Sequence, residues 1–215
     1  MLVRIRHPEK LIYPESDGQP MGENTLQFQW IMTLFHGFEN LYFHDQNIFV
    51  ASDLFWYPVE GDPTTVLAPD LMIVLGQAKG HRGSYKQWEE GNLAPQVVFE
   101  IQSPSNRPKG TTSKRKFYSQ YGVEEFYQYD PDTLEFQVWV RTDRRLKAVD
   151  ETQKFSSPLL GVRFEMADEG LRVIRPDGRA FLTYKEMITE AVVQQERAAK
   201  LAAKLRELGV DPDQI

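Results

Sequence analysis

The sequence predicts a mixed α/β fold of the α+β type, with the order helix, three strands, helix, strand, strand. Two observations carry this prediction. Apolar residues recur at three- and four-residue spacing between Gly22 and Phe38, which indicates an amphipathic helix. Three apolar runs follow, at 48–58, 71–75 and 96–102, and Gly or Pro residues separate them. We therefore expect one helix that precedes three consecutive strands.

The second half of the core begins after a polar loop. Thr112 or Ser113 is placed to cap a short helix that reaches Tyr121, and Gly122 is placed to end it. Two aromatic-rich segments then flank the turn 130–132, which predicts a strand hairpin.

A long helix is predicted at the end of the chain. Thr183 and Glu186 form a capping-box pattern, and a segment rich in Ala, Lys, Glu and Arg runs from there to Gly209. The sequence thus predicts a globular domain over 1–182 and a helical tail over 183–215.

The tail carries apolar residues at three- or four-residue spacing. They are Ala191, Ala198, Leu201, Leu205 and Leu208. This spacing fits a coiled-coil seam or a helix docked on its own domain, and it lasts too few heptads to choose between them. We expect a homodimer, formed through the tail or through a sheet edge.

Composition excludes several classes of protein. Of the 215 residues none is cysteine, so disulfides, thiolate zinc sites and iron–sulfur clusters are excluded. No apolar run approaches the ~20 residues of a membrane helix, and the N-terminus lacks the apolar stretch of a secretory signal. We expect a cytoplasmic protein with no membrane partner. The four histidines show no paired ligand spacing, and neither a phosphate-binding loop nor a nucleophile elbow is present.

Positive charge is concentrated although the net charge is −6. The three clusters are Lys79, His81, Arg82 and Lys86; Arg107, Lys109, Lys114, Arg115 and Lys116; and Arg141, Arg144, Arg145 and Lys147. They fit either solvated loops and a helix face or a basic functional surface.

A glutamate interrupts the third apolar run. In "QVVFEIQSPS" the strand alternation puts Glu100 and Gln102 on one face, opposite to Phe99 and Ile101. A carboxylate in an apolar strand requires a compensating partner or a metal ion. A structural ion pair with an arginine, or a strand exposed on one face, would also account for Glu100.

Asp70 is a candidate second carboxylate. It directly precedes the strand 71–75, and in a strand meander its side chain could converge with Glu100. Two carboxylates that hold Mg²⁺ or Mn²⁺, with water and a substrate phosphate as further ligands, form an ordinary hydrolytic site.

These residues carry a resemblance to a known family. "PD" at 69–70, "E-x-Q" at 100–102 and a following helix with lysines resemble the PD-(D/E)XK nuclease superfamily. More narrowly, "APDLMIVLG", "VVFEIQSPS", "KRKFYSQYGVEEFYQYDP" and the terminal "LRELGVDPD" resemble the Uma-type family of restriction endonucleases. The resemblance spans about residues 22–140 and the tail. It implies a restriction-endonuclease-like αβββαβ core with a mixed central sheet.

The resemblance also implies a magnesium-dependent endonuclease that hydrolyses DNA. Asp70 and Glu100 would be metal ligands, with the main-chain carbonyl of Ile101 as a third, and Glu23 would match a helix carboxylate that completes the site in some members. Gln102 departs from the motif, because it stands where the superfamily has a lysine. A neutral amide supplies no charge, although it can hydrogen-bond a water or a phosphate.

The missing lysine is expected from the next helix. Alignment on "YGV" puts Lys114 at that position, with a catalytic role. Lys116 lies about 200° further round the helix, so both cannot face one site. A solvated lysine is the alternative interpretation of Lys114.

Two functions therefore remain open. The first is a metal-dependent DNA endonuclease. The second is a protein that keeps the nuclease fold but has a degenerate site at Gln102, and serves as an interaction or assembly module.

Overall fold

The computed structural model describes residues 11–16, 24–104 and 111–212. The chain divides into two compact units, Met1–Phe181 and Leu182–Ile215. No helix in the described ranges is long and apolar enough to cross a membrane.

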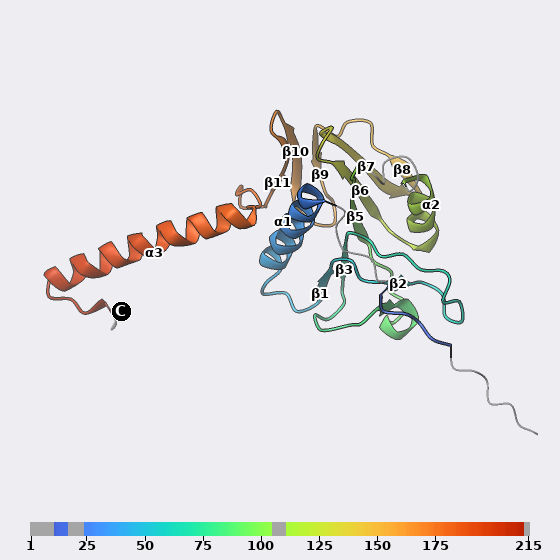
Figure 1. Ribbon diagram of the computed structural model, residues 1–215, viewed down its shortest axis with the longest axis horizontal. Helices are drawn as coiled ribbons and strands as arrows, with labels where there is room; N and C mark the ends of the chain where they lie inside the picture. Colours follow the sequence, from blue (N-terminus) through green and yellow to red (C-terminus); the bar gives the residue numbers. More distant parts are fainter. Residues whose placement is uncertain (1–10, 17–23, 105–110, 213–215) are drawn as a thin grey trace, which may run out of the picture. The chain divides into compact units, whose positions relative to one another are not determined.

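Helix α1 (Thr25–Leu41) covers one face of the central sheet (Figure 1). The Asn24 side chain caps it by accepting a hydrogen bond from the Gln27 N–H at 2.8 Å. The predicted helix is confirmed, but it runs three residues beyond Phe38. Gly22, expected near its start, lies outside the described residues.

The central sheet has the predicted mixed topology. Its strands, in spatial order, are β1 (Ile48–Ala51), β3 (Leu71–Leu75), β5 (Val97–Ile101), β6 (Glu125–Asp130), β7 (Glu135–Thr142) and β8 (Arg145–Ala148). Neighbours are antiparallel except β5 and β6, which run parallel. The crossover between these two strands contains α2 (Thr111–Tyr121), so the αβββαβ order is confirmed.

The first apolar run is broken into two strands. β1 ends at Ala51, and the short β2 (Trp56–Tyr57) leaves the central sheet to pair in parallel with β4 (Tyr85–Lys86). Between them Asp53 adopts a left-handed backbone with φ 51°, and its N–H donates to the Pro69 carbonyl at 3.1 Å. This turn places Asp53 beside the start of β3.

The second helix and the hairpin are present as predicted, but Thr112 and Ser113, predicted as caps, lie inside α2. α2 ends where Gly122 adopts φ 105°, a conformation that favours glycine. The Asp130 carboxylate organises the turn between β6 and β7 by accepting from the N–H groups of Asp132 and Thr133.

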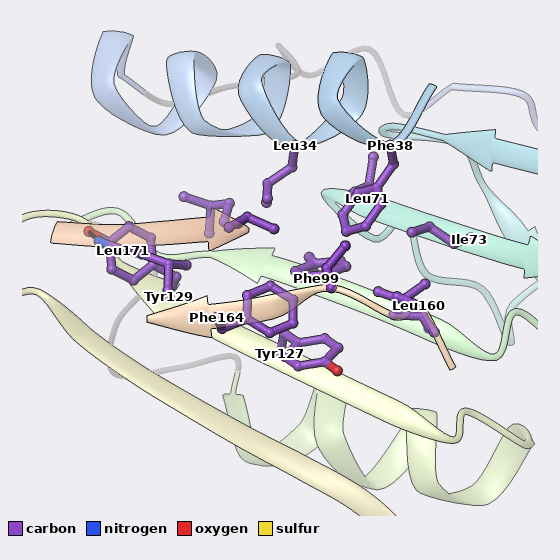
Figure 2. Close-up of a cluster of buried hydrophobic side chains, with 14 of the residues drawn as sticks. Leu34, Phe38, Leu71, Ile73, Phe99, Tyr127, Tyr129, Leu160, Phe164 and Leu171 are labelled. Atoms are coloured by element: carbon purple, nitrogen blue, oxygen red, sulfur yellow. Dashed lines mark hydrogen bonds between the residues drawn. The ribbon is translucent and has the colours of Figure 1, made fainter. Parts of the chain in front are cut away.

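Each face of the sheet has its own apolar core. On one face Leu34 and Phe38 from α1 pack toward Leu71, Phe99 and neighbouring side chains (Figure 2). The small sheet β9 (Lys154–Ser156), β10 (Arg163–Ala167) and β11 (Gly170–Ile174) completes this core. On the other face α2 packs on the sheet through Phe117 and Tyr118. Glu100 lies on the α2 face.

The second unit consists mainly of α3 (Tyr184–Glu207). The predicted capping box is present, because the Thr183 and Glu186 side chains each accept from the other's backbone N–H. The helix ends before Gly209, whose φ is 75°, as expected. None of its residues is buried.

Candidate metal and phosphate site

Strand register brings Asp70 beside β5. Leu71 pairs with Phe99, so the preceding Asp70 lies opposite the end of β5. Its Oδ2 accepts a hydrogen bond from the Ile101 N–H at 2.6 Å. The Asp70 side chain thus continues the ladder in place of another backbone carbonyl, and this fixes the carboxylate at the strand end.

Glu100 is buried, with 4% of its surface exposed, and α2 supplies a donor for each of its oxygens. Lys114 Nζ lies 2.6 Å from Oε2, and the Tyr118 hydroxyl donates to Oε1. The donors are four residues apart, so they share one face of the helix. Lys114 and Tyr118 therefore compensate the buried Glu100 carboxylate, and not the arginine considered from the sequence.

Tyr118 was not predicted as a site residue. It is fully buried, stacks on Trp56 at 6.3 Å between ring centroids and contacts Phe126, so its ring serves the core while its hydroxyl serves the site. Burial and the Glu100 carboxylate raise the pKa of Tyr118 well above its usual value, which keeps the hydroxyl protonated as a donor. Its four-residue spacing from Lys114 was the available signal.

The Ile101 carbonyl lies on the same side of β5 as Asp70. In a strand the N–H and C=O of one residue point to the same neighbour, and the Ile101 N–H points to Asp70. The Ile101 oxygen accepts a bond from Gln27 Nε2 of α1 at 2.9 Å. A carbonyl oxygen has a second lone pair, so this bond orients the oxygen without using all of its capacity.

The electrostatics of the site favour a cation. Burial and the nearby Glu100 charge raise the pKa of Asp70 to about 8, against the smaller lowering effects of Lys114 and the Ile101 N–H; Asp53 also raises it. A carboxyl group whose pKa is raised by a second carboxylate binds a proton, or a cation that replaces the proton.

Of the remaining predicted residues, Gln102 and Lys116 are described by the structure. Gln102, 8% exposed, follows Glu100 on the α2 side, and its N–H continues the ladder to the Tyr129 carbonyl at 2.8 Å. Lys116 is exposed, whereas Lys114 reaches Glu100. Glu23 lies outside the described residues.

The donor set suits Mg²⁺ or Mn²⁺. It consists of two carboxylates and a main-chain carbonyl, all hard oxygen ligands, and Asp70 accepts through Oδ2 so that Oδ1 remains for a cation. Within 11–16, 24–104 and 111–212, no group of three or more His, Asp or Glu residues could hold a metal ion. The strand register and the effect of Glu100 on the pKa of Asp70 show that these two carboxylates are neighbours.

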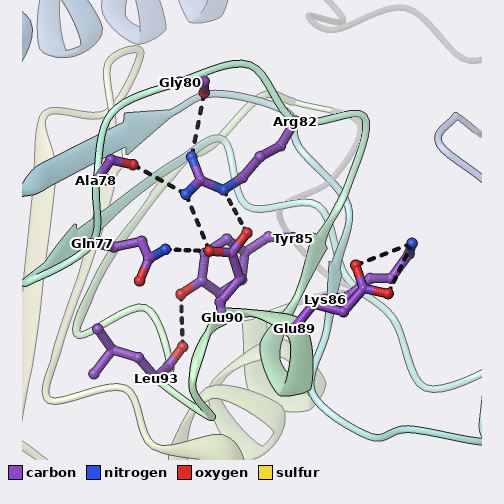
Figure 3. Close-up of polar contacts among 9 residues, drawn as sticks. All are labelled: Gln77, Ala78, Gly80, Arg82, Tyr85, Lys86, Glu89, Glu90 and Leu93. Atoms are coloured by element: carbon purple, nitrogen blue, oxygen red, sulfur yellow. Dashed lines mark hydrogen bonds and ion pairs between the residues drawn. The ribbon is translucent and has the colours of Figure 1, made fainter.

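The basic cluster 79–86 lies in a loop that internal contacts fix. The Arg82 guanidinium donates two hydrogen bonds to the Glu90 carboxylate, at 2.6 and 3.1 Å. It also donates to the Ala78 and Gly80 carbonyls (Figure 3). Lys79 and Lys86 form ion pairs with glutamates. These three cations therefore serve the structure of the loop, since each forms an ion pair with a glutamate.

The α2 cluster differs. The helix carries Lys114, Arg115 and Lys116 and no acidic residue. Arg115 lies over the Trp139 ring, 5.3 Å from its centroid, and Lys116 is exposed. Arg141 fastens the C-terminal end of α2 by donating to the Ser119 carbonyl at 2.9 Å. This helix is the basic element nearest to the carboxylates.

Comparison with known proteins agrees with this fold. A crystal structure titled "a putative nuclease belonging to DUF820 from Anabaena variabilis ATCC 29413" matches with a TM-score of 0.50 and 14% sequence identity, over 66% of this chain and 77% of that one. At this identity the match shows a shared fold. No curated protein matches the sequence. The model of the Uma2 family, described as "Putative restriction endonuclease", matches residues 12–180, and the chain therefore belongs to that family.

Proposed function

We propose that this protein is a metal-dependent endonuclease that hydrolyses phosphodiester bonds in DNA. The observation that carries the proposal is the convergence of Asp70 and Glu100 at the ends of adjacent strands, with Lys114 on the second carboxylate. Membership of a family described as restriction endonucleases supports the reaction class and the DNA substrate.

Asp70, Glu100 and the Ile101 carbonyl would hold Mg²⁺ or Mn²⁺. When bound, the metal supplies Lewis acidity that activates water and stabilises charge on the phosphate. The protein contributes fixed ligands, because Tyr118 orients Glu100 and Gln27 orients the Ile101 carbonyl. The Lys114 ammonium offers positive charge to the phosphate oxygens as negative charge develops on them. Gln102 offers an amide donor at the motif's lysine position.

The first experiment is calorimetric titration of Mg²⁺ and Mn²⁺ into the wild type and the Asp70→Asn/Glu100→Gln double variant, combined with plasmid cleavage. We expect metal binding and cleavage in the wild type and neither in the double variant. The matched control is Asp53→Asn, which removes a nearby carboxylate from a left-handed position that asparagine tolerates. Equal binding or equal cleavage by the double variant and the wild type contradicts the proposal.

A second candidate function is assembly through the tail. α3 exposes Tyr184, Ile188 and Leu201, its C-cap residue Leu208 is exposed as well, and each of these side chains is about half or more exposed. Such a surface suits a second copy of the chain, so we propose a homodimer formed through α3. If the site is catalytically degenerate at Gln102, this assembly role would remain as the function of the fold.

A further inference from the structure

We infer that Gln128 orients the attacking water beside Glu100, a role that rests on the proposed nuclease function. The inference begins with strand register. In the parallel pair β5–β6, Gln128 is the direct partner of Glu100. Paired residues leave the same face of a sheet about one strand spacing apart, roughly 4.8 Å. Gln128 is therefore a neighbour of the buried carboxylate on the face where Lys114 and Tyr118 approach.

The Gln128 side chain carries an unsatisfied acceptor. Its Oε1 is buried and has no hydrogen-bond partner among the described residues. A buried acceptor without a donor is unfavourable, and native proteins satisfy nearly all of them. Departures of this kind concentrate at functional sites, where a substrate or reacting group supplies the partner. Because Gln128 lies next to Glu100, the missing partner is the attacking water.

The chemistry needs an acceptor at this point. The Tyr118 hydroxyl is held by its bond to Glu100, and Lys114, whose ammonium group has no lone pair, cannot accept the O–H of a water molecule. The Gln128 oxygen can, and its Nε2 can donate to a phosphate oxygen. In the hydrolysis the water oxygen forms a P–O bond, the bond to the leaving oxygen breaks, and the water proton passes to solvent. The neutral amide takes up no proton and only fixes the direction of attack.

The test compares Gln128→Met with Gln137→Met. Methionine has the length of glutamine but no buried acceptor, and Gln137 is the exposed partner of Gln128 on β7, one strand further from Glu100. We measure the melting temperature in EDTA and the rate of Mg²⁺-dependent cleavage of supercoiled plasmid DNA. For Gln128→Met we expect a melting temperature that is higher by about 2–4 °C and cleavage that is at least about tenfold slower. For Gln137→Met we expect neither change.

Opposite shifts in stability and rate separate this role from a structural one, because loss of a structural side chain lowers both. Gln128→Glu keeps an acceptor oxygen, so it should cleave faster than Gln128→Met. Gln128→Met that melts lower, fails to fold or cleaves within twofold of the wild type overturns the inference, while Asp70→Asn still tests the proposed function in the same assay. A wild type that cleaves no better than Asp70→Asn overturns the proposed function, and the inference falls with it.

Discussion

At the scale of single residues, the site depends on how one buried carboxylate is satisfied. Glu100 has 4% of its surface exposed and receives a donor on each oxygen, one charged and one neutral. A single lysine would leave one Glu100 oxygen without a donor, and a second cationic side chain would compete with a metal ion for the carboxylate. The combination of Lys114 and Tyr118 fixes the side chain and leaves one lone pair on each oxygen.

Tyr118→Phe should therefore weaken metal binding. Loss of the hydroxyl leaves Glu100 Oε1 without its donor, at a cost of about 1–3 kcal/mol in stability, and frees the carboxylate to rotate. We expect an affinity for Mg²⁺ that is about 10- to 100-fold lower by calorimetry, because partners of metal ligands commonly contribute that much. Tyr121→Phe, in the same helix, is the control and should bind like the wild type. Unchanged affinity in Tyr118→Phe would show that Glu100 needs no second donor.

Metal binding should strengthen as pH rises from 6 to 8. The pKa of Asp70 is raised to about 8, and the metal binds only the ionised form. Below that pKa the affinity for Mg²⁺ should rise about tenfold per pH unit, and above it the affinity should level off. Below that pKa, the binding of each metal ion should release one proton. Titration in buffers of different ionisation enthalpy measures the proton release. A pH-independent affinity would indicate that Asp70 is already ionised at pH 6.

The raised pKa of Asp70 has the opposite effect on the stability of the metal-free protein, which should fall as pH rises. A carboxyl group whose pKa is higher in the folded state than in the unfolded state stabilises the fold at low pH. That contribution is fully present below the unfolded value of 3.8 and is lost as pH rises toward 8. In EDTA, the Asp70→Asn variant should therefore lose less stability between pH 6 and 9 than the wild type.

At the scale of elements, the sequence predicted what periodicity and turn chemistry encode locally. The capping box at Thr183 and the stop at Gly122 depend on near neighbours, and both are found. β8 was not predicted, because an exposed edge strand such as Arg145–Ala148 has no apolar alternation. Asp70 and Glu100 were recognisable because charge in an apolar context is unusual. Gln128 was not, because its proximity to Glu100 exists only through the parallel β5–β6 register.

Glu125 joins β6 to the chain that leads into β10. Its carboxylate accepts from the Tyr127 hydroxyl at 2.6 Å, the Ser157 hydroxyl at 2.5 Å and the Leu159 N–H at 3.0 Å. The residue is 1% exposed and lies on the face opposite to Glu100, so we assign it to structure. It holds the 157–159 segment against the central sheet.

Glu125→Ala should destabilise the protein without changing metal binding. Two buried hydroxyl donors and the Leu159 N–H lose their acceptor, and we expect a loss of about 3 kcal/mol or more in the free energy of unfolding, measured by urea denaturation. Glu124→Ala is the matched control, because its ion pair with Arg141 is 44% exposed on the glutamate side and should contribute below about 1 kcal/mol. Weaker Mg²⁺ binding by folded Glu125→Ala would contradict the separation of the two faces.

At the scale of the whole molecule, charge is distributed unevenly. The chain has a net charge of −6, yet α2 carries three cations and no acid; Lys114 is paired with Glu100, while Lys116 is exposed. In the 79–86 loop Lys79, Arg82 and Lys86 are occupied by glutamates. A polyanion would therefore be drawn toward α2 more than toward that loop, which is the side on which Glu100 lies.

The tail adds a second surface with a regular pattern. Alternating spacings of three and four residues link Tyr184, Met187, Ala191, Gln194, Ala198, Leu201, Leu205 and Leu208. The structure extends the pattern found in the sequence, because α3 is helical over nearly all of these positions and buries none of its own residues. Two such helices in parallel would set Ala191 and Ala198 each against its own copy, which leaves poor packing. In the antiparallel arrangement Ala191 faces Leu201, and Glu190 lies near Lys204 of the other helix.

We therefore expect a homodimer in which α3 pairs with its copy in antiparallel orientation. Leu201→Glu should give a monomer by light scattering at concentrations where the wild type is a dimer. Val193→Glu should remain a dimer, because Val193 has a similar exposure, 54% against 58%, but lies off the seam. Since the chain has no cysteine, Leu205→Cys tests the orientation: parallel helices would bring the two thiols together, whereas antiparallel helices place Met187 opposite each thiol. A disulfide dimer of Leu205→Cys would contradict the antiparallel arrangement, and a monomeric wild type would contradict pairing altogether.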